Sequence, residues 1–168
     1  MLKLLIISSF LFSSCLFAGG VAQEDTDVKI ERAFLTDGCT GWIDGTRKYD
    51  WSHCCEKHDL QMWAGGSKEN RKKADKELKA CIKEASNGFH AWVMGAGVFI
   101  GGLSPIKIES KKWGNAWGKN AGYFELTPEQ IIDLENSLFS DQTHYSNEEV
   151  LEFIEELKEL NSLDKNNQ

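Results

Sequence analysis

One run of six residues constrains this chain more than any other: Cys54-Cys55-Glu56-Lys57-His58-Asp59. On an α-helix, residues three or four apart share a face, whereas adjacent residues point about 100° apart. Cys55 and His58 would therefore lie on one side, while Cys54 and Asp59 face other directions. One short helix could be tied to two parts of the protein and still present a base and a carboxylate to a common pocket.

The N-terminus predicts export. Lys3 is followed by an apolar run from Leu4 to Phe17 and then by small residues up to Ala22. A positive start, a short apolar core and small residues near the exit are typical of a secretory signal peptide, and the run is short for a membrane anchor. We expect a signal peptide at residues 1–22 and a secreted or periplasmic protein. The alternative is a lipid anchor on Cys15, because residues 12–15 resemble a bacterial lipoprotein cleavage box.

Export also predicts that the cysteines form disulfides. Once Cys15 is removed with the signal peptide, an even number of cysteines remains for an oxidising compartment, where disulfides are the default: Cys39, Cys54, Cys55 and Cys81. A bond between Cys54 and Cys55 would close a strained ring of eight atoms. Two connectivities remain open.

The charge is uneven along the chain. Residues 23–124 carry 16 Lys and Arg against 14 Asp and Glu, whereas residues 125–168 carry 2 against 12. The overall acidity therefore lies in the C-terminal quarter. No basic stripe is interleaved with aromatic residues, so we expect no nucleic-acid partner.

The spacing of apolar residues predicts a mainly α fold. Residues 51–63 and 68–85 are expected as helices that Gly65-Gly66 joins, and so short a connection favours an antiparallel pair. We expect a short helix at residues 30–35 and a loop, rich in Gly and Asp, at residues 37–50.

The C-terminal half is expected to add further helices. Residues 89–103 are apolar, and we expect a buried segment, with a lipid-facing or pocket-lining segment as the alternative. Trp113 and Trp117 lie among lysines and suit a lipid–water boundary or a loop core equally well. Capping boxes at residues 127–130 and 146–149 start two amphipathic helices. We thus expect a domain at residues 23–124 and an acidic helical extension at residues 125–168, whose acidic face is solvated or binds a protein partner.

Asp75 gives His58 a partner. It lies two turns into the second helix and can reach back to His58 on the first. A carboxylate on one imidazole nitrogen fixes the tautomer and leaves the other nitrogen as a base. Cys81 lies six residues beyond Asp75, and Cys54 lies four residues before His58. A Cys54–Cys81 bridge could therefore coexist with a His58–Asp75 contact.

That bridge would leave Cys55 for Cys39 and so hold the Gly/Asp loop beside the first helix. Asp59 and the loop oxygens would then meet. Such oxygens suit Ca²⁺, a hard cation that takes six to eight of them.

This constellation resembles the secreted phospholipase A2 superfamily. The matching features are CC-x-x-HD at residues 54–59, Cys39 nineteen residues before His58, and AD-x₅-C at residues 74–81. The sequence Asp37-Gly38-Cys39 resembles in particular the bacterial and fungal branch.

The resemblance implies a complete site. It implies the bridges Cys39–Cys55 and Cys54–Cys81, and a Ca²⁺ ion on Asp37, the Gly38 carbonyl and Asp59. It also implies that His58, held by Asp75, takes a proton from the water that attacks the sn-2 ester of a phospholipid. The products would be a fatty acid and a lysophospholipid, formed by a monomer at a phospholipid membrane surface.

Two alternatives stand beside this interpretation. Met62 occupies the place where the superfamily usually has a tyrosine that supports the aspartate, so the chain could be an inactive phospholipase-like scaffold that binds a membrane or a protein. A zinc site is the other alternative by ligand type, although its spacing fits no familiar zinc pattern: His53, Cys54, Cys55 and His58.

Overall fold

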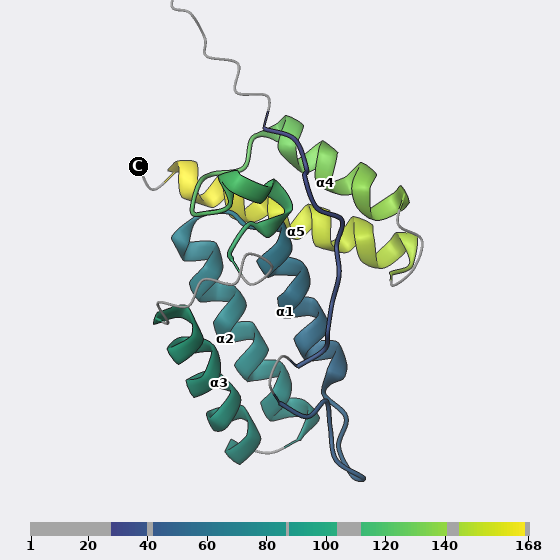
Figure 1. The fold of residues 1–168 in the computed structure, drawn as a ribbon, viewed down its shortest axis with the longest axis vertical. Coiled ribbons are helices and arrows are strands. Elements are labelled where there is room, and N and C mark those ends of the chain that lie inside the picture. The colour runs from purple at the N-terminus through teal and green to yellow at the C-terminus, as the bar shows by residue number, and fades with distance from the viewer. Residues whose placement is uncertain (1–27, 40–41, 87, 104–111, 141–144, 167–168) are drawn as a thin grey trace, which may run out of the picture.

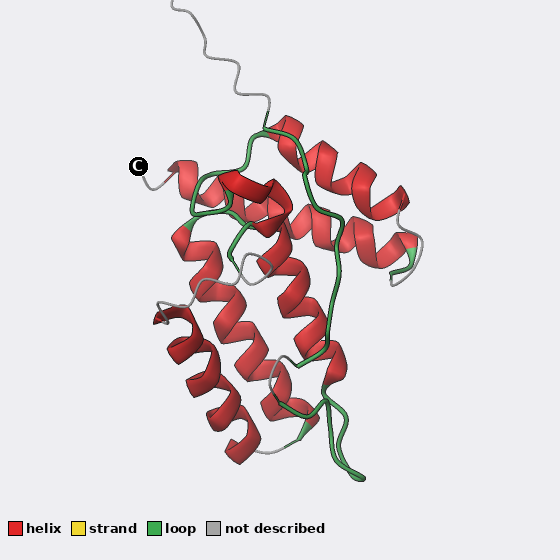
Figure 2. Cartoon of the chain, in the orientation of Figure 1, coloured by secondary structure: helices red, strands yellow, loops and turns green. Residues whose placement is uncertain are grey.

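The chain folds into a helical protein. The computed structural model describes residues 28–39, 42–86, 88–103, 112–140 and 145–166, so the expected signal peptide and Cys15 lie outside the described residues. No strand occurs within these ranges (Figure 1, Figure 2). The prediction of a mainly α fold is confirmed. The helices are α1 (Ser52–Ala64), α2 (Lys68–Ala85), α3 (Gly88–Leu103), the 3₁₀-helix η2 (Asn115–Asn120), α4 (Pro128–Ser140) and α5 (Asn147–Asn166).

Helices α1 and α2 form an antiparallel pair, which Figure 1 shows side by side. The chain reverses at Gly65 and Gly66, whose φ angles of 83° and 122° lie in the region that favours glycine. A Cβ at Gly65 would lie 2.6 Å from the Cα of Gly114. Glycine therefore lets the turn touch a second stretch of backbone. Ser67 then caps α2 by accepting a hydrogen bond from the backbone N–H of Asn70.

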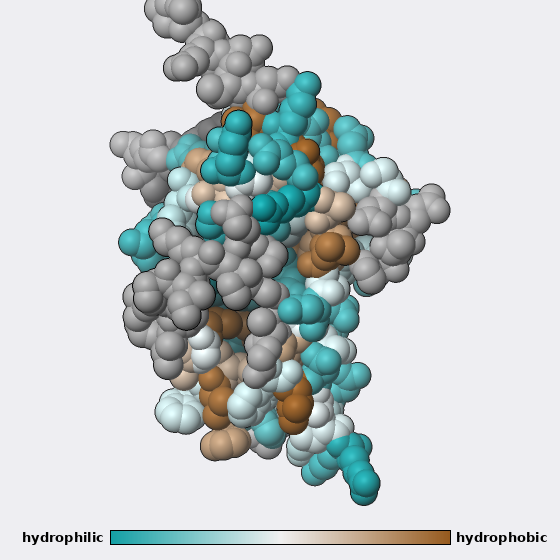
Figure 3. All heavy atoms as spheres, viewed as in Figure 1, coloured by the Kyte–Doolittle hydropathy of each residue, from teal (hydrophilic) through white to brown (hydrophobic). Residues whose placement is uncertain are grey.

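Helix α3 packs against α2 with one face only. Ala91 and Met94 are buried, whereas Phe89 and Trp92 are 65% and 64% exposed. In Figure 3 hydrophobic atoms gather over the lower part of the molecule, where Figure 1 places α3. Over residues 89–98, where the side chains are described, the expected buried segment is buried along one face and open to solvent along the other. No helix in the described ranges is long and apolar enough to cross a bilayer.

The segment before the loop is extended, and the expected helix at residues 30–35 is wrong. Phe34 is buried while Leu35 is 81% exposed, as in an extended chain whose side chains alternate. Its backbone groups find partners elsewhere. The N–H groups of Glu31 and Arg32 donate to the Ala116 carbonyl, and the Arg32 carbonyl accepts a hydrogen bond from the Trp63 indole at 2.8 Å. These tertiary hydrogen bonds replace the ones that a helix would make.

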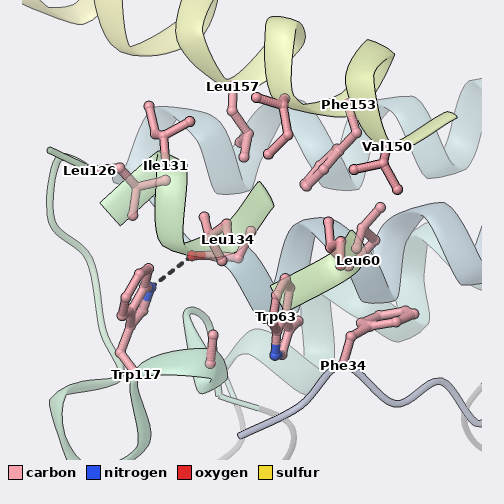
Figure 4. Packing of buried hydrophobic residues seen from close by; sticks show 14 residues of the cluster. Phe34, Leu60, Trp63, Trp117, Leu126, Ile131, Leu134, Val150, Phe153 and Leu157 are labelled. Carbon is pink, nitrogen blue, oxygen red and sulfur yellow. Dashed lines mark hydrogen bonds between the residues drawn. The ribbon is translucent and has the colours of Figure 1, made fainter. Parts of the chain in front are cut away.

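Trp113 and Trp117 belong to the loop core rather than to a lipid boundary. Both are buried, and their indole N–H groups donate to the carbonyls of Gly66 and Ala64, each at 2.8 Å. Figure 4 draws the Trp117 bond as a dashed line. The two tryptophans thereby fasten the stretch around η2 to the turn between α1 and α2.

Both predicted capping boxes are present. At the start of α4, Thr127 Oγ1 accepts from the Gln130 N–H, and the Gln130 side chain accepts from the Thr127 N–H. Ser146 and Glu149 make the same reciprocal pair at the start of α5. Each box satisfies two backbone donors that an isolated helix end leaves open.

Helices α4 and α5 share one hydrophobic core with α1. Figure 4 shows side chains of α5 directed toward those of α1 and α4. The extension therefore completes the core of the preceding residues and does not stand apart from them. The buried members are Phe34, Leu60, Trp63, Ala64, Ala116, Trp117, Leu126, Ile131, Leu134, Leu138, Val150, Phe153, Ile154 and Leu157.

Candidate active site

His58 and Asp75 face each other across the α1–α2 pair. The Nε2 atom of His58 lies 2.8 Å from Oδ1 of Asp75, and the imidazole is buried. An ionised carboxylate can only accept, so Nε2 carries the proton and Nδ1 keeps the lone pair. The structure thus brings together the two residues expected to form the catalytic pair, and the contact through Nε2 leaves Nδ1 as the ring nitrogen that could accept a proton.

Arg71 is the second partner of Asp75. It lies one turn earlier on α2, and its Nε donates to Oδ1 and Oδ2 at 3.2 and 3.4 Å. Burial alone would raise the pKa of Asp75, but the hydrogen bond from His58 and the positive charge of Arg71 outweigh it, and the pKa is lowered. Asp75 is therefore ionised at neutral pH.

Two disulfides frame this pair. Cys54–Cys81 joins α1 to α2, and Cys39–Cys55 joins the preceding loop to α1. This is the pairing that the resemblance implies. Because both bonds leave from neighbouring positions on α1, the helix that carries His58 is fastened on two sides.

A cavity of about 140 Å³ opens beside His58, between α1 and α2. Apolar and polar groups share its wall, and its volume leaves room for water. The lining residues are Cys54, Lys57, His58, Gln61, Glu77, Leu78 and Cys81.

Thr36 connects the expected cation loop to α1. Its hydroxyl donates to Oδ2 of Asp59 at 2.8 Å and accepts from the Gly38 N–H at 3.1 Å. Gly38 has a φ of 70°, and a Cβ there would lie 2.5 Å from Oδ1 of Asp44. That same Asp44 oxygen accepts from the Cys39 N–H at 2.7 Å. The loop is therefore folded tightly against Asp59.

The donors in this region fit a hard cation. Asp37 and Asp59 offer carboxylate oxygens and Gly38 offers its carbonyl oxygen, which is the chemistry that Ca²⁺ prefers. Thr36 holds Gly38 close to Asp59, and Asp37 lies exposed beside Gly38. Within the described residues, no group of three or more His, Cys, Asp or Glu side chains includes Asp37 or Asp59, so carbonyl oxygens and water would have to complete the shell.

Tyr145 brings the C-terminal extension to this region. Its ring contacts that of Phe34, with 5.8 Å between centroids. Burial raises the pKa of Tyr145, and the negative charges of Glu56, Asp59 and Glu149 raise it further. The phenol therefore stays protonated near the expected metal carboxylate.

A soft-metal site does not form in the oxidised chain. His53 lies 3.4 Å from the sulfur of Cys54 and 3.5 Å from that of Cys81, and these three form the only group of its kind in the described residues. Both sulfurs are already bonded to each other. Zinc binds thiolates, and a disulfide offers none. The zinc interpretation is therefore wrong for the disulfide-bonded protein.

An ion-pair cluster fastens α5 to the helix pair. Glu156 lies 2.6 Å from Lys73 and 3.4 Å from Lys57, and Lys73 also pairs with Glu77 at 2.9 Å. Gln61 donates to Glu77 at 2.8 Å. Part of the acidic face of α5 is thus engaged within the chain.

Sequence reasoning missed three residues of this site. Arg71 was one of many cations on α2, and only its spacing of four from Asp75 distinguishes it. Thr36 directly precedes Asp37 and carried no signal of its own. Glu156 lies 83 residues from its partner Lys73, a distance that no local pattern spans.

The comparisons with known proteins leave the family open. No protein family model matches the chain, and neither a curated protein nor a solved structure matches it.

Proposed function

We propose that this protein is a calcium-dependent hydrolase that cleaves the sn-2 ester of phospholipids. The observation that carries the proposal is the 2.8 Å contact between His58 Nε2 and Asp75 Oδ1, on two helices that a disulfide joins. It supports the catalytic pair that the sequence motif implies.

The chain's own groups can perform the proton transfer. Asp75 holds the imidazole and stabilises the positive charge that develops on it. His58 then accepts a proton from water at Nδ1, and that water attacks the ester carbonyl carbon. The cavity beside His58 supplies space for the water. Protonated His58 can return the proton to the leaving alkoxide, which becomes the lysophospholipid hydroxyl.

Asp37, the Gly38 carbonyl and Asp59 would hold the calcium ion. When bound, Ca²⁺ supplies positive charge for the carbonyl oxygen and for the substrate phosphate. Because Asp59 follows His58 directly on α1, one proposed ligand adjoins the base, while Asp37 and Gly38 lie in the loop before the helix.

Exposed apolar residues next to the loop support a lipid substrate. Leu35 precedes Thr36, and Trp42 donates its backbone N–H to the Cys39 carbonyl. Leu35, Trp42 and Ile43 are large and exposed. Apolar side chains around a site entrance favour contact with an aggregated lipid over a soluble ester.

Fatty-acid release from phospholipid vesicles tests the proposal. We expect the oxidised protein to release fatty acid with millimolar Ca²⁺ and to stop when the metal is chelated. His58→Gln should abolish release. His53→Gln is the matched control, because it makes the same change five residues earlier at an exposed position, and it should retain the rate.

The alternative is a scaffold that binds lipid without cleaving it. Met62 favours it, since a thioether cannot donate a hydrogen bond to Asp75. Vesicle binding without fatty-acid release would establish this alternative and exclude the hydrolase. If the protein also fails to bind Ca²⁺ by calorimetry, the metal assignment is excluded as well.

A further inference from the structure

We propose that Arg71 is the positioning residue that holds Asp75 against His58. The proposal rests on the proposed function, because it assigns Arg71 a part in the same reaction. Its geometric content can nevertheless be measured without any turnover.

The contacts around Asp75 show the arrangement. Oδ1 accepts from both His58 Nε2, at 2.8 Å, and Arg71 Nε, at 3.2 Å. The Arg71 Nε also lies 3.4 Å from Oδ2. One donor group thus faces both carboxylate oxygens, which restricts rotation of the carboxylate about its terminal torsion. A charge-assisted contact of this kind is stronger than a neutral hydrogen bond.

Arg71 is itself held in place. Its guanidinium lies 5.5 Å from the ring centroid of Trp113, within the range of a cation–π contact. Trp113 is buried and donates to the Gly66 carbonyl at 2.8 Å. The Arg71 side chain is only 14% exposed, so solvent competes little for its donors.

A backbone hydrogen bond at the end of α1 holds the residue next to Trp113 in place. The Met62 carbonyl accepts the N–H of Gly114 at 2.8 Å, which holds the residues around Trp113 next to the end of α1. Trp113 directly precedes Gly114, and its ring lies against the Arg71 guanidinium. The support for Asp75 therefore comes from Arg71, one turn earlier on the same helix, and the Trp113 ring packs against Arg71.

The consequence for His58 is a fixed orientation. With Asp75 restrained, the Nε2–H bond is aimed at one oxygen and Nδ1 stays available to water. Without Arg71 the carboxylate can rotate, and the imidazole loses part of its restraint. A residue that acts in this way should affect the rate of turnover more than substrate affinity.

Three variants of the full chain test the proposal. Arg71→Gln removes the charge, Arg71→Lys keeps the charge but cannot face both oxygens equally, and Lys72→Gln is the control on an exposed neighbouring position. Two quantities are measured: fatty-acid release with Ca²⁺, and the exchange of the His58 Nε2 proton with water by NMR. Circular dichroism checks the fold of each variant.

We expect Arg71→Gln to lower kcat about tenfold, the low end of the roughly 10- to 100-fold known for the partners that orient metal ligands, which position side chains in a comparable way. KM should stay within about twofold of the parent value, since no substrate contact is removed. The His58 proton should exchange faster by a similar factor to the fall in kcat. Arg71→Lys should lie between, and Lys72→Gln should match the parent protein.

Unchanged proton exchange and unchanged kcat in a folded Arg71→Gln protein would overturn the proposal. If Arg71→Gln does not fold, Arg71→Lys decides in the same way. If the parent protein releases no fatty acid, the proposed function fails, and the proton exchange alone then decides whether Arg71 positions the pair.

Discussion

Removing the Cys54–Cys81 disulfide tests how the α1–α2 pair is held together. The bond closes a loop with a sequence separation of 27 residues. Loop-closure entropy predicts that it stabilises the fold by about 3.5 kcal/mol, against about 3 kcal/mol for the separation of 16 residues at Cys39–Cys55. Alanine is the better replacement, because Cys54 is buried and a serine there would bury a hydroxyl group.

Urea unfolding, followed by tryptophan fluorescence, measures the effect. We expect the Cys54→Ala/Cys81→Ala protein to lose about 3.5 kcal/mol in free energy of unfolding. Its m-value should rise, because the unfolded chain becomes more expanded. The Cys39→Ala/Cys55→Ala protein is the matched comparison. A loss below about 1 kcal/mol, with no change in m, would refute the reasoning and show that the unfolded chain is already restricted across these helices.

Three further predictions concern single side chains. Glu156→Gln should lower the free energy of unfolding, because it removes the charge that pairs with Lys57 and Lys73. The loss should be only about 1 kcal/mol, since both lysines are partly exposed. No change in urea unfolding would show that α5 is held by apolar contacts alone. Gly38→Ala should destabilise the loop by about 1–2 kcal/mol and weaken Ca²⁺ binding in calorimetry, since its φ is 70°; equal affinity would exclude this loop as the metal site. The lowered pKa of Asp75 stabilises the fold above the ordinary carboxylate pKa of about 3.9, and this contribution disappears as pH falls through the lower folded value. The stability difference between the parent and Asp75→Asn should therefore shrink between pH 7 and pH 2; a constant difference would contradict it.

The helices that carry their own local signals were predictable from the sequence. The helix at residues 68–85 agrees with α2, and the two capping boxes mark the starts of α4 and α5. Such signals lie within one or two turns of the residues that they govern. The helix expected at residues 30–35 failed for the opposite reason. Its backbone bonds to Ala116 and Trp63 are long-range, and they override a weak local preference.

The residues of the candidate site likewise fall into those that local spacing predicts and those that depend on long-range contacts. His58, Asp75, Cys54 and Cys81 could be placed because helical spacing relates them across a short turn, whereas the Cys39–Cys55 pairing is what the resemblance implies. Arg71 was hidden among equivalent cations, and its role depends on the indole of Trp113, 42 positions further along the chain. The role of Thr36 could not be predicted, since its hydroxyl finds its partner Asp59 only after the loop has folded back onto α1.

The shared core has a consequence for how the molecule is made. The α1–α2 hairpin and both disulfides involve residues close in sequence, so they can form while the chain is still emerging. Leu60 and Trp63 of α1, however, belong to a core that also includes Ile154 and Leu157 of α5. Until α5 is present, this core is incomplete and part of its apolar surface stays open to water and to other chains. Helix α5 must therefore be synthesised before the hydrophobic core can close and the risk of aggregation falls.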